Sequence, residues 1–380
     1  MFASILLNLI FFFLPTQLGL HFWPGFSYVA GFRIDYLSPT LYFNDLLLLI
    51  YVLLNTKKIF SFFKKYSKIV LILFIPIFIN VLFSISPLNT VFWFLHLFLY
   101  LLFVLSLKLN KISFDRVYPP LILSTFLIII LELLQLLNQG SLGGALYWFG
   151  ERSFNLGTPN IAKIDILGRQ YLRPYATFSH PNSLAGYLFL ILLLLIRFKK
   201  KAWIKATIIF GILITLSKSV IAVLLITYLG IKTEFILIFS LITTLIPLTP
   251  LPSKFIDLPN YIADRWYYGD LAKKIITKYP IFGVGYGNYV SAVPLVLPLR
   301  YFSVSKFQPV HNLTLVAITE FGFLNLAVIL VYIKKKLAKF INTSSLHYFS
   351  LILFITCFDH YFWTLPQNKI ILLISILYIV

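Results

Sequence analysis

Long apolar runs separated by short polar segments make up most of the 380-residue chain. A helix needs about 20 mostly apolar residues to cross the hydrocarbon core of a bilayer. The pattern predicts about twelve such spans: residues 2–20, 41–55, 69–84, 90–107, 117–138, 182–197, 203–217, 219–231, 233–249, 311–333, 345–359 and 366–380. The stretch 203–249 allows other partitions. We therefore expect an all-α, polytopic membrane protein that forms one integral domain over residues 1–380.

Composition supports this class. Hydrophobic residues make up 60% of the chain and charged residues 12%, against about 25% charged in a soluble domain. The net charge of +20 would suggest nucleic acid in a soluble protein. Here the basic residues lie in short clusters between apolar runs, as membrane topology requires. We expect a lipid bilayer and no nucleic acid as partner.

The basic clusters predict an orientation. With the N-terminus in the cytoplasm, the short inner loops hold these residues: Lys57, Lys58, Lys64, Lys65, Lys68; Lys108, Lys111, Arg116; Arg197, Lys199, Lys200, Lys201, Lys205; Lys232; Lys334, Lys335, Lys336 and Lys339. All inner loops are then basic, as the positive-inside rule asks. Both termini are expected in the cytoplasm. The first run has no basic start and no small-residue cleavage site, so we interpret it as a span.

Three outer segments follow from this orientation: residues 21–40, 139–181 and 250–310. The last is the longest, and apolar and charged residues alternate with helical spacing over 262–279, before Pro280. This pattern predicts an amphipathic helix in a large extracytoplasmic loop. It either lies on the membrane surface or covers a functional site.

Polar, ionisable residues at the mouths of spans are costly and are candidates for function. His311 opens one span beside Asn312 and could act as a general base, although, for the histidine taken alone, a helix-capping or interfacial role is the favoured explanation. For His180 and Asn182, which flank a proline at a helix start, we favour a cap. His360 ends another apolar run and could pair with its acidic neighbour or line the same vestibule.

Cationic and acidic candidates complete the set. Arg265 and Arg173 are outer arginines, and the guanidinium fork suits a diphosphate. Lys218 lies between two apolar runs, where it could also be an interfacial lysine. Glu320 falls inside a span and should face the bundle interior, paired or protonated. Glu132 is a similar case.

We expect no metal and no cofactor. The histidines lack metal-ligand spacing along the chain, and the single cysteine, Cys357, excludes an internal disulfide and a cysteine cluster. The glycines of segment 281–288 follow a predicted helix rather than a strand, which argues against a nucleotide loop.

Four segments match motifs of one family in order and spacing. Residues 177–185 look like "GTFxxPNxxA", 216–219 like "SRxxxL", 265–288 like "R…P(L/I)xGxGxGN", and His311-Asn312 with Gly322 like "HNx9G". On these residues the chain resembles the O-antigen ligase and O-antigen polymerase superfamily of bacterial membrane glycosyltransferases. Two positions depart from the family pattern: Lys218 replaces the usual arginine, and Asn325 stands where a small residue is common.

The resemblance implies a GT-C-like, multi-pass enzyme of the bacterial plasma (inner) membrane. It would transfer a glycan from an undecaprenyl-diphosphate carrier to an acceptor hydroxyl during synthesis of lipopolysaccharide or another cell-envelope polysaccharide. His311 would be the base, and Arg265 and Lys218, with Arg173, would hold the diphosphate on the outer face, without a metal. The acceptor could be a lipid, a glycan or a protein.

Other functions stay open. A polymerase of the same superfamily shares these motifs. A transporter or flippase for lipid-linked glycans would instead show broken helices and ionisable groups at mid-membrane. A purely structural scaffold would explain neither the outer arginines nor His311.

The predicted orientation can be tested with single cysteines at Ser253 and Ser303. Both lie in the segment 250–310, which should face outward. An impermeant thiol reagent added to intact cells should label both positions. Protection of both in intact cells, with labelling after lysis, would show that the orientation is reversed.

Overall fold

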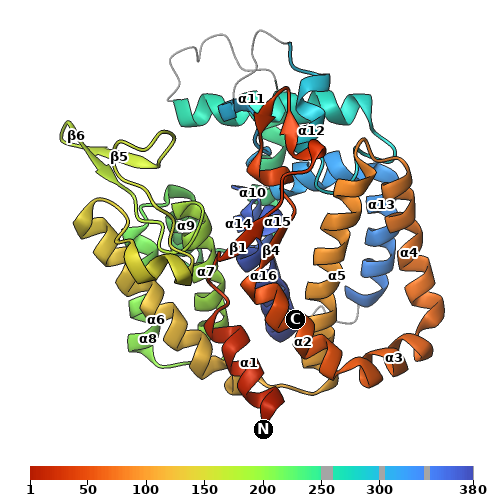
Figure 1. The fold of residues 1–380 in the computed structure, drawn as a ribbon, viewed down its shortest axis with the longest axis horizontal. Helices are drawn as coiled ribbons and strands as arrows, with labels where there is room; N and C mark the ends of the chain where they lie inside the picture. The colour runs from red at the N-terminus through yellow and green to blue at the C-terminus, as the bar shows by residue number, and fades with distance from the viewer. Residues whose placement is uncertain (250–259, 299–303, 338–342, 380) are drawn as a thin grey trace.

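The computed structural model describes residues 1–249, 260–298, 304–337 and 343–379. It is mostly helical (Figure 1). Each predicted apolar run contains a helix. These helices are α1 (Phe2–Phe12), α2 (Phe43–Leu54), α4 (Ser67–Leu82), α5 (Pro87–Leu109), α6 (Phe114–Asn138), α7 (Pro181–Arg197), α8 (Ala202–Ile214), α9 (Lys218–Tyr228), α10 (Thr233–Leu245), α13 (Leu313–Leu337), α14 (Thr343–Thr356) and α16 (Pro366–Ile379).

Helix length supports fewer independent spans than we predicted. In the described part of the chain, α5, α6 and residues Leu313–Val331 of α13 are long and apolar enough to cross a membrane. Helix α2 qualifies only together with α3 (Thr56–Lys65), from which it is bent by 69°. The other apolar helices have 10–17 residues, and at 1.5 Å per residue they are shorter than the roughly 30 Å hydrocarbon core. Helix length therefore does not establish about twelve spans.

The first run differs from its prediction. Its helix ends at Phe12 instead of continuing to residue 20, and the chain then forms β1. Three two-stranded antiparallel pairs occur where we expected only helix and loop: β1 (Gly19–His21) with β4 (Thr40–Tyr42), β2 (Tyr28–Val29) with β3 (Phe32–Arg33), and β5 (Lys163–Ile166) with β6 (Arg169–Leu172). Two-residue turns close the second and third pairs, and Leu167 and Gly168 both have positive φ, as a hairpin turn requires.

Short helical turns fill the connections. They are η1 (Gly25–Ser27), η2 (Asp35–Leu37), η3 (Gly144–Phe149), η4 (Ile246–Leu248), α12 (Tyr289–Ala292), η6 (Val293–Leu295), η8 (Val304–Lys306) and α15 (Tyr361–Thr364).

Helix α7 is enclosed by other helices of the bundle. Every residue from Ser183 to Leu195 is buried, and the helix packs against α8, α9, α14 and α16. A helix that is apolar on all sides is stable only when other helices surround it. Its N-terminus carries Pro181 and Asn182, so the most enclosed helix of the fold begins at a candidate functional segment.

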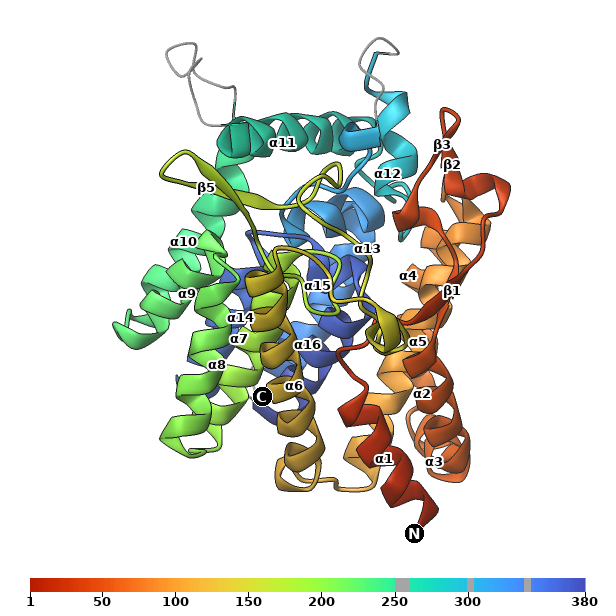
Figure 2. The same ribbon diagram turned by 60° about the vertical axis from the view of Figure 1, so that its left-hand side comes forward.

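Three of the predicted inner loops, 57–68, 108–116 and 197–205, meet at one end of the bundle. Lys58 Nζ donates to Asn110 Oδ1 at 2.5 Å, and Lys200 pairs with Asp115. Tyr378 OH donates to the Ile112 carbonyl at 3.1 Å, which brings the end of α16 to the same place. Both termini lie toward this end, away from α11 (Figures 1 and 2).

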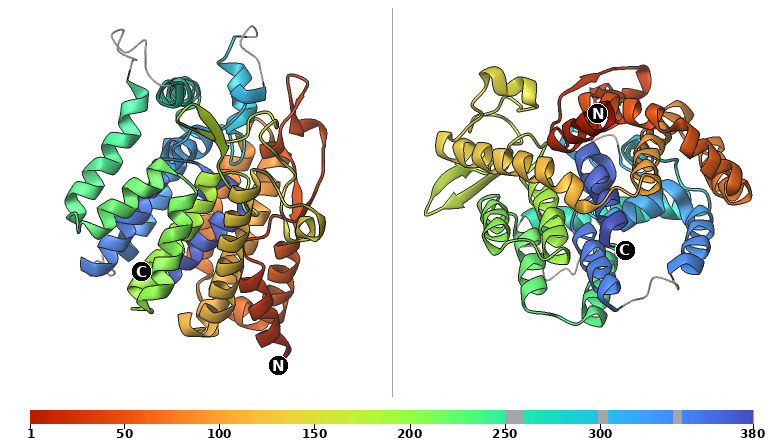
Figure 3. Two further views of the ribbon diagram at one scale, coloured as in Figure 1. Left: turned by 90° about the vertical axis from the view of Figure 1, so that its left-hand side faces the viewer. Right: turned by 90° about the horizontal axis from the view of Figure 1, so that it is seen from below.

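The amphipathic helix predicted over 262–279 is α11 (Asn260–Lys278), which lies across the other end of the bundle and is seen end-on in Figure 3, left. Its apolar residues Tyr268, Leu271 and Ile275 are buried in a core with Val284 and Val316. The apolar side is thus covered by protein, which favours a cover over the bundle end rather than a helix on the membrane surface. Ser253 and Ser303 lie outside the described residues.

A glycine-rich loop supplies hydrogen-bond partners to the backbone at a break in α13. Gly322, with φ +70°, interrupts the helix. Segment 280–285 lies against the break: the Val284 N–H donates to the Thr319 carbonyl at 3.0 Å, and the Phe323 N–H donates to the Pro280 carbonyl at 2.8 Å. Asn80 of α4 donates to the Glu320 carbonyl at 2.8 Å. In a helix that crosses a membrane, a non-helical residue is tolerated only where such partners satisfy its backbone.

Replacing Gly322 should therefore destabilise the fold. A Cβ at Gly322 would lie 2.4 Å from Gly283 N, and its φ disfavours L side chains. Gly322→Ala should lower the free energy of unfolding by about 2 kcal/mol or more, measured by thermal unfolding in detergent. Gly25→Ala is the matched control, because a Cβ there meets nothing within 4 Å. Equal melting temperatures for both variants would contradict the assignment of the break.

Candidate functional site

Asn182 joins two of the sequence motifs. It follows His180, which caps α7 by accepting the Asn182 backbone N–H on Nδ1 at 3.1 Å. The Asn182 side-chain oxygen accepts from Arg173 Nη2 at 2.8 Å and from Ser217 Oγ at 3.0 Å. The cap predicted for His180 is therefore confirmed. Asn182 has a further role that we did not predict, since its side chain links segment 173–182 to the turn before α9 by hydrogen bonds.

Asp359 connects this group to a pair of histidines. Asn182 Nδ2 donates to Asp359 Oδ2 at 3.3 Å. On the other oxygen, Oδ1, His311 Nδ1 lies at 3.3 Å and His360 Nε2 at 3.8 Å. The two imidazole rings are stacked with their centroids 5.5 Å apart. Asp359 and His360 are buried, whereas the His311 side chain keeps 27% of its surface exposed and is the accessible member.

The buried His360 and the half-buried His180 are both neutral at pH 7. Burial lowers the pKa of His360 to about 4, against the opposing effect of the Asp359 charge. Burial likewise lowers the pKa of His180 to about 4. The carboxylate of Asp359 is stabilised by hydrogen bonds with Asn182, with His311 and with the backbone N–H of His360.

Helix α11 contributes two side chains to the site, Arg265 and Tyr268. Arg265 Nη1 donates to the Phe358 carbonyl at 3.0 Å, and the His311 carbonyl lies 3.5 Å from the same nitrogen. The ring of Tyr268 meets the His311 ring edge-on, with centroids 5.6 Å apart. One face of the predicted amphipathic helix thus holds an arginine and an aromatic ring against the candidate base.

Lys218 borders the group. It is the first residue of α9, and its side chain is exposed. Its neighbour Ser217 makes the hydrogen bond to Asn182 described above. The turn that resembles the family's "SRxxxL" motif therefore lies beside the cluster.

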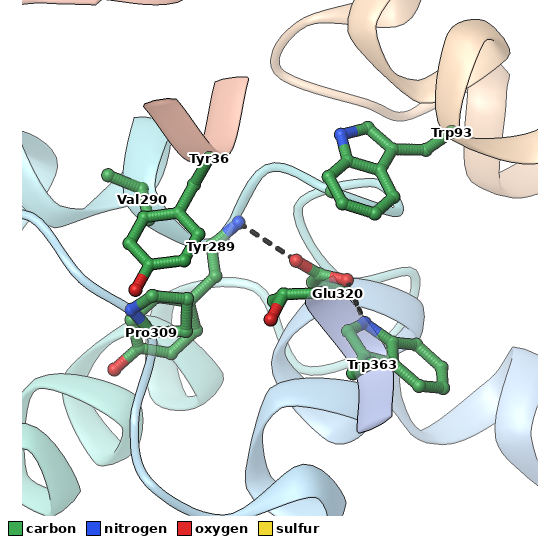
Figure 4. A pocket seen from close by; sticks show the side chains of 9 residues that line it. Tyr36, Trp93, Tyr289, Val290, Pro309, Glu320 and Trp363 are labelled. Atoms are coloured by element: carbon green, nitrogen blue, oxygen red, sulfur yellow. Dashed lines mark hydrogen bonds between the residues drawn. The ribbon is translucent and has the colours of Figure 1, made fainter. Parts of the chain in front are cut away.

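Three candidates lie outside the cluster. Asn312 caps α13, since its Oδ1 accepts from the Leu315 N–H at 3.1 Å. Glu320 accepts from the Tyr289 N–H at 3.2 Å and from Trp363 Nε1 at 2.6 Å. It lines a separate, small pocket with aromatic walls that include Trp93 and Trp363 (Figure 4). Glu132 is buried and, among the described residues, has no hydrogen-bond partner.

One sequence argument needs correction. We argued against a metal because no metal-ligand cluster is visible along the chain. In space, one ligand atom each of His311, Asp359 and His360 lie within 4.8 Å of one another. Ligand spacing along a chain detects sites built on one element, and these residues come from two segments about 48 positions apart.

Sequence reasoning also missed the central role of Asp359. We considered it only as a neighbour of His360, whereas it contacts three candidate residues. The sequence signal that could have identified it is a carboxylate, Asp359, directly before a histidine, His360, at the end of an apolar run. Comparisons with protein-family models, with curated proteins and with solved structures gave no match.

Proposed function

We propose that the protein is a membrane glycosyltransferase of the O-antigen ligase type, which transfers a glycan from an undecaprenyl-diphosphate carrier to an acceptor hydroxyl. One observation carries the proposal: the segments that resemble the family's motifs, distant in sequence, meet around Asp359. Arg173, Asn182, His311 and Arg265 are joined there by contacts of 2.8–3.5 Å. The site would face the outside of the plasma membrane, because three basic loops meet at the opposite end of the bundle.

His311 is suited to be the base. When its Nδ1–H points at Asp359 Oδ1, the lone pair of Nε2 is free to take a proton. A carboxylate in this place fixes the tautomer and stabilises the imidazolium that forms. As the acceptor oxygen bonds to the anomeric carbon, its proton passes to Nε2, and the bond from that carbon to the diphosphate oxygen breaks.

The cations would hold the leaving group. The electron pair of the broken bond stays on the diphosphate, where a fixed positive charge lowers the barrier. Arg173 uses two donors on Asn182 and the Thr215 carbonyl, and a guanidinium has five. Arg265 likewise retains donors beyond its bond to Phe358, and Lys218 adds a charge at the border.

A polymerase would use the same site with a second lipid-linked glycan as acceptor. A flippase is the alternative from another class, and two observations favour it: the broken helix α13, and the buried Lys369, whose Nζ donates to Tyr286 OH at 2.9 Å. Purified protein in liposomes with a lipid-linked oligosaccharide separates the three. A ligase transfers the glycan to another acceptor, a polymerase lengthens it, and a flippase only moves it.

Removing the base or its neighbouring charge should stop transfer. His311→Ala should lower turnover by about 10²–10⁴-fold, and Arg265→Ala by a comparable factor, with each rate normalised to folded protein. His21→Ala and Arg33→Ala are matched controls at the same end of the fold. His21 instead contacts Ser38 and Thr40, and Arg33 lies over the Trp23 ring. Near wild-type rates in both site variants would contradict the proposal and favour the flippase.

Lys218 should tolerate arginine. Lys218→Arg restores the family's usual residue and a bidentate fork, so turnover should be equal or higher. Lys218→Ala should transfer poorly, because it removes a charge near the diphosphate. The same liposome assay measures both. A rate for Lys218→Ala equal to wild type would exclude a role for this residue.

A further inference from the structure

We infer that His311, Asp359 and His360 form a binding site for Zn²⁺, and that the ion inhibits the enzyme by occupying the nitrogen that faces Asp359. The binding itself is independent of the proposed function, whereas the inhibition rests on it. The ligand set is two imidazole nitrogens and one carboxylate oxygen, which is a common protein donor set for zinc.

The spacing of the three atoms suits a tetrahedral ion. Zinc bonds of about 2.0–2.2 Å place neighbouring ligand atoms of a tetrahedron about 3.3–3.6 Å apart. His311 Nδ1 and Asp359 Oδ1 are 3.3 Å apart, and His360 Nε2 and Asp359 Oδ1 are 3.8 Å apart. The three ligand atoms lie within 4.8 Å of one another. Small rotations of the side chains would complete the triangle, and the fourth position would open toward the exposed part of His311.

His360 is already oriented as a ligand. Its Nδ1 lies 2.9 Å from Thr364 Oγ1. That hydroxyl can accept the Nδ1 proton, because its own proton has a partner in the His360 carbonyl at 3.3 Å. The ring then presents the lone pair of Nε2 toward Asp359. His360 Nε2 and Asp359 Oδ1 are then two buried acceptors 3.8 Å apart. A cation bound between them would stabilise this arrangement. A hydrogen bond on the second nitrogen is typical of metal-binding histidines.

The bound ion would prevent His311 from acting as a base, because it changes which ring nitrogen carries the proton. Coordination at His311 Nδ1 displaces the proton that otherwise points at Asp359. A neutral imidazole then carries its single proton on Nε2, so the nitrogen that would accept the proton of the acceptor hydroxyl has no lone pair. The ion also takes the carboxylate oxygen that stabilises the imidazolium. Arg265 and Arg173 repel a dication, so the site should release zinc to a chelator.

Metal binding is tested without any activity measurement. Purified wild-type protein should bind one Zn²⁺ in competition with a fluorescent indicator, and Co²⁺ should give a visible ligand-field absorption. Asp359→Asn and His360→Gln, which keep similar volumes, should lose both. Thr364→Val should raise the half-saturating Zn²⁺ concentration about 10-fold or more. His21→Ala should bind like wild type. Absence of binding in wild type, or equal binding in all variants, would overturn the site.

The inhibition is tested by turnover of a lipid-linked glycan. Zn²⁺ should suppress transfer and a chelator should restore it, while Mg²⁺ should have no effect because it prefers oxygen ligands. In His360→Gln, the Zn²⁺ concentration for half-inhibition should rise at least about 10-fold. Loss of turnover in chelator that Zn²⁺ restores would overturn the inhibition and make the ion a cofactor. Zinc binding by a protein that transfers no glycan would support the metal site and overturn the proposed function.

Discussion

The buried carboxylate of Asp359 is the constraint on which this end of the molecule depends. A charge removed from water must be matched by hydrogen bonds or opposite charge, because leaving it alone costs several kcal/mol. Here the match comes from Asn182 on α7, from His311 before α13 and from the backbone of His360. Each partner lies at the end of a different helix. Satisfying one charge therefore fixes the relative positions of three helix ends, and with them the proposed catalytic groups.

The second organising feature is the glycine loop against the break in α13. The loop 280–288 returns from α11, and the break at Gly322 exposes peptide groups that this loop satisfies. Because α11 and α13 are joined in this way, Arg265 and His311 belong to one connected unit. The glycines that could suggest a phosphate loop are explained by close backbone contact: a Cβ at Gly283 would lie 2.5 Å from the Glu320 carbonyl oxygen.

The sequence predicted correctly those helices whose position depends on the local pattern of apolar and polar residues. Apolar runs located the helices, and helical spacing with Pro280 located α11 to within two residues at its start. The hairpins were missed, although Leu167-Gly168 is a turn pair, because their strands of two to four residues carry too little periodicity. The cluster around Asp359 could not be derived from spacing. His311 and Asp359 are 48 positions apart, and only the packing of α13 beside α15 brings them together.

Helix α7, which begins at the cluster, is enclosed by other helices. Its residues Ser183–Leu195 are enclosed by other helices, so in a membrane its sides would contact protein rather than acyl chains. Lipid-facing helices tilt and shift when bilayer thickness changes, but an enclosed helix moves only with the helices around it. Asn182 and His180 lie at the N-terminus of this enclosed helix. The positions of Asn182 and His180 would therefore depend little on the lipid composition of the membrane, while the outer helices adapt to it.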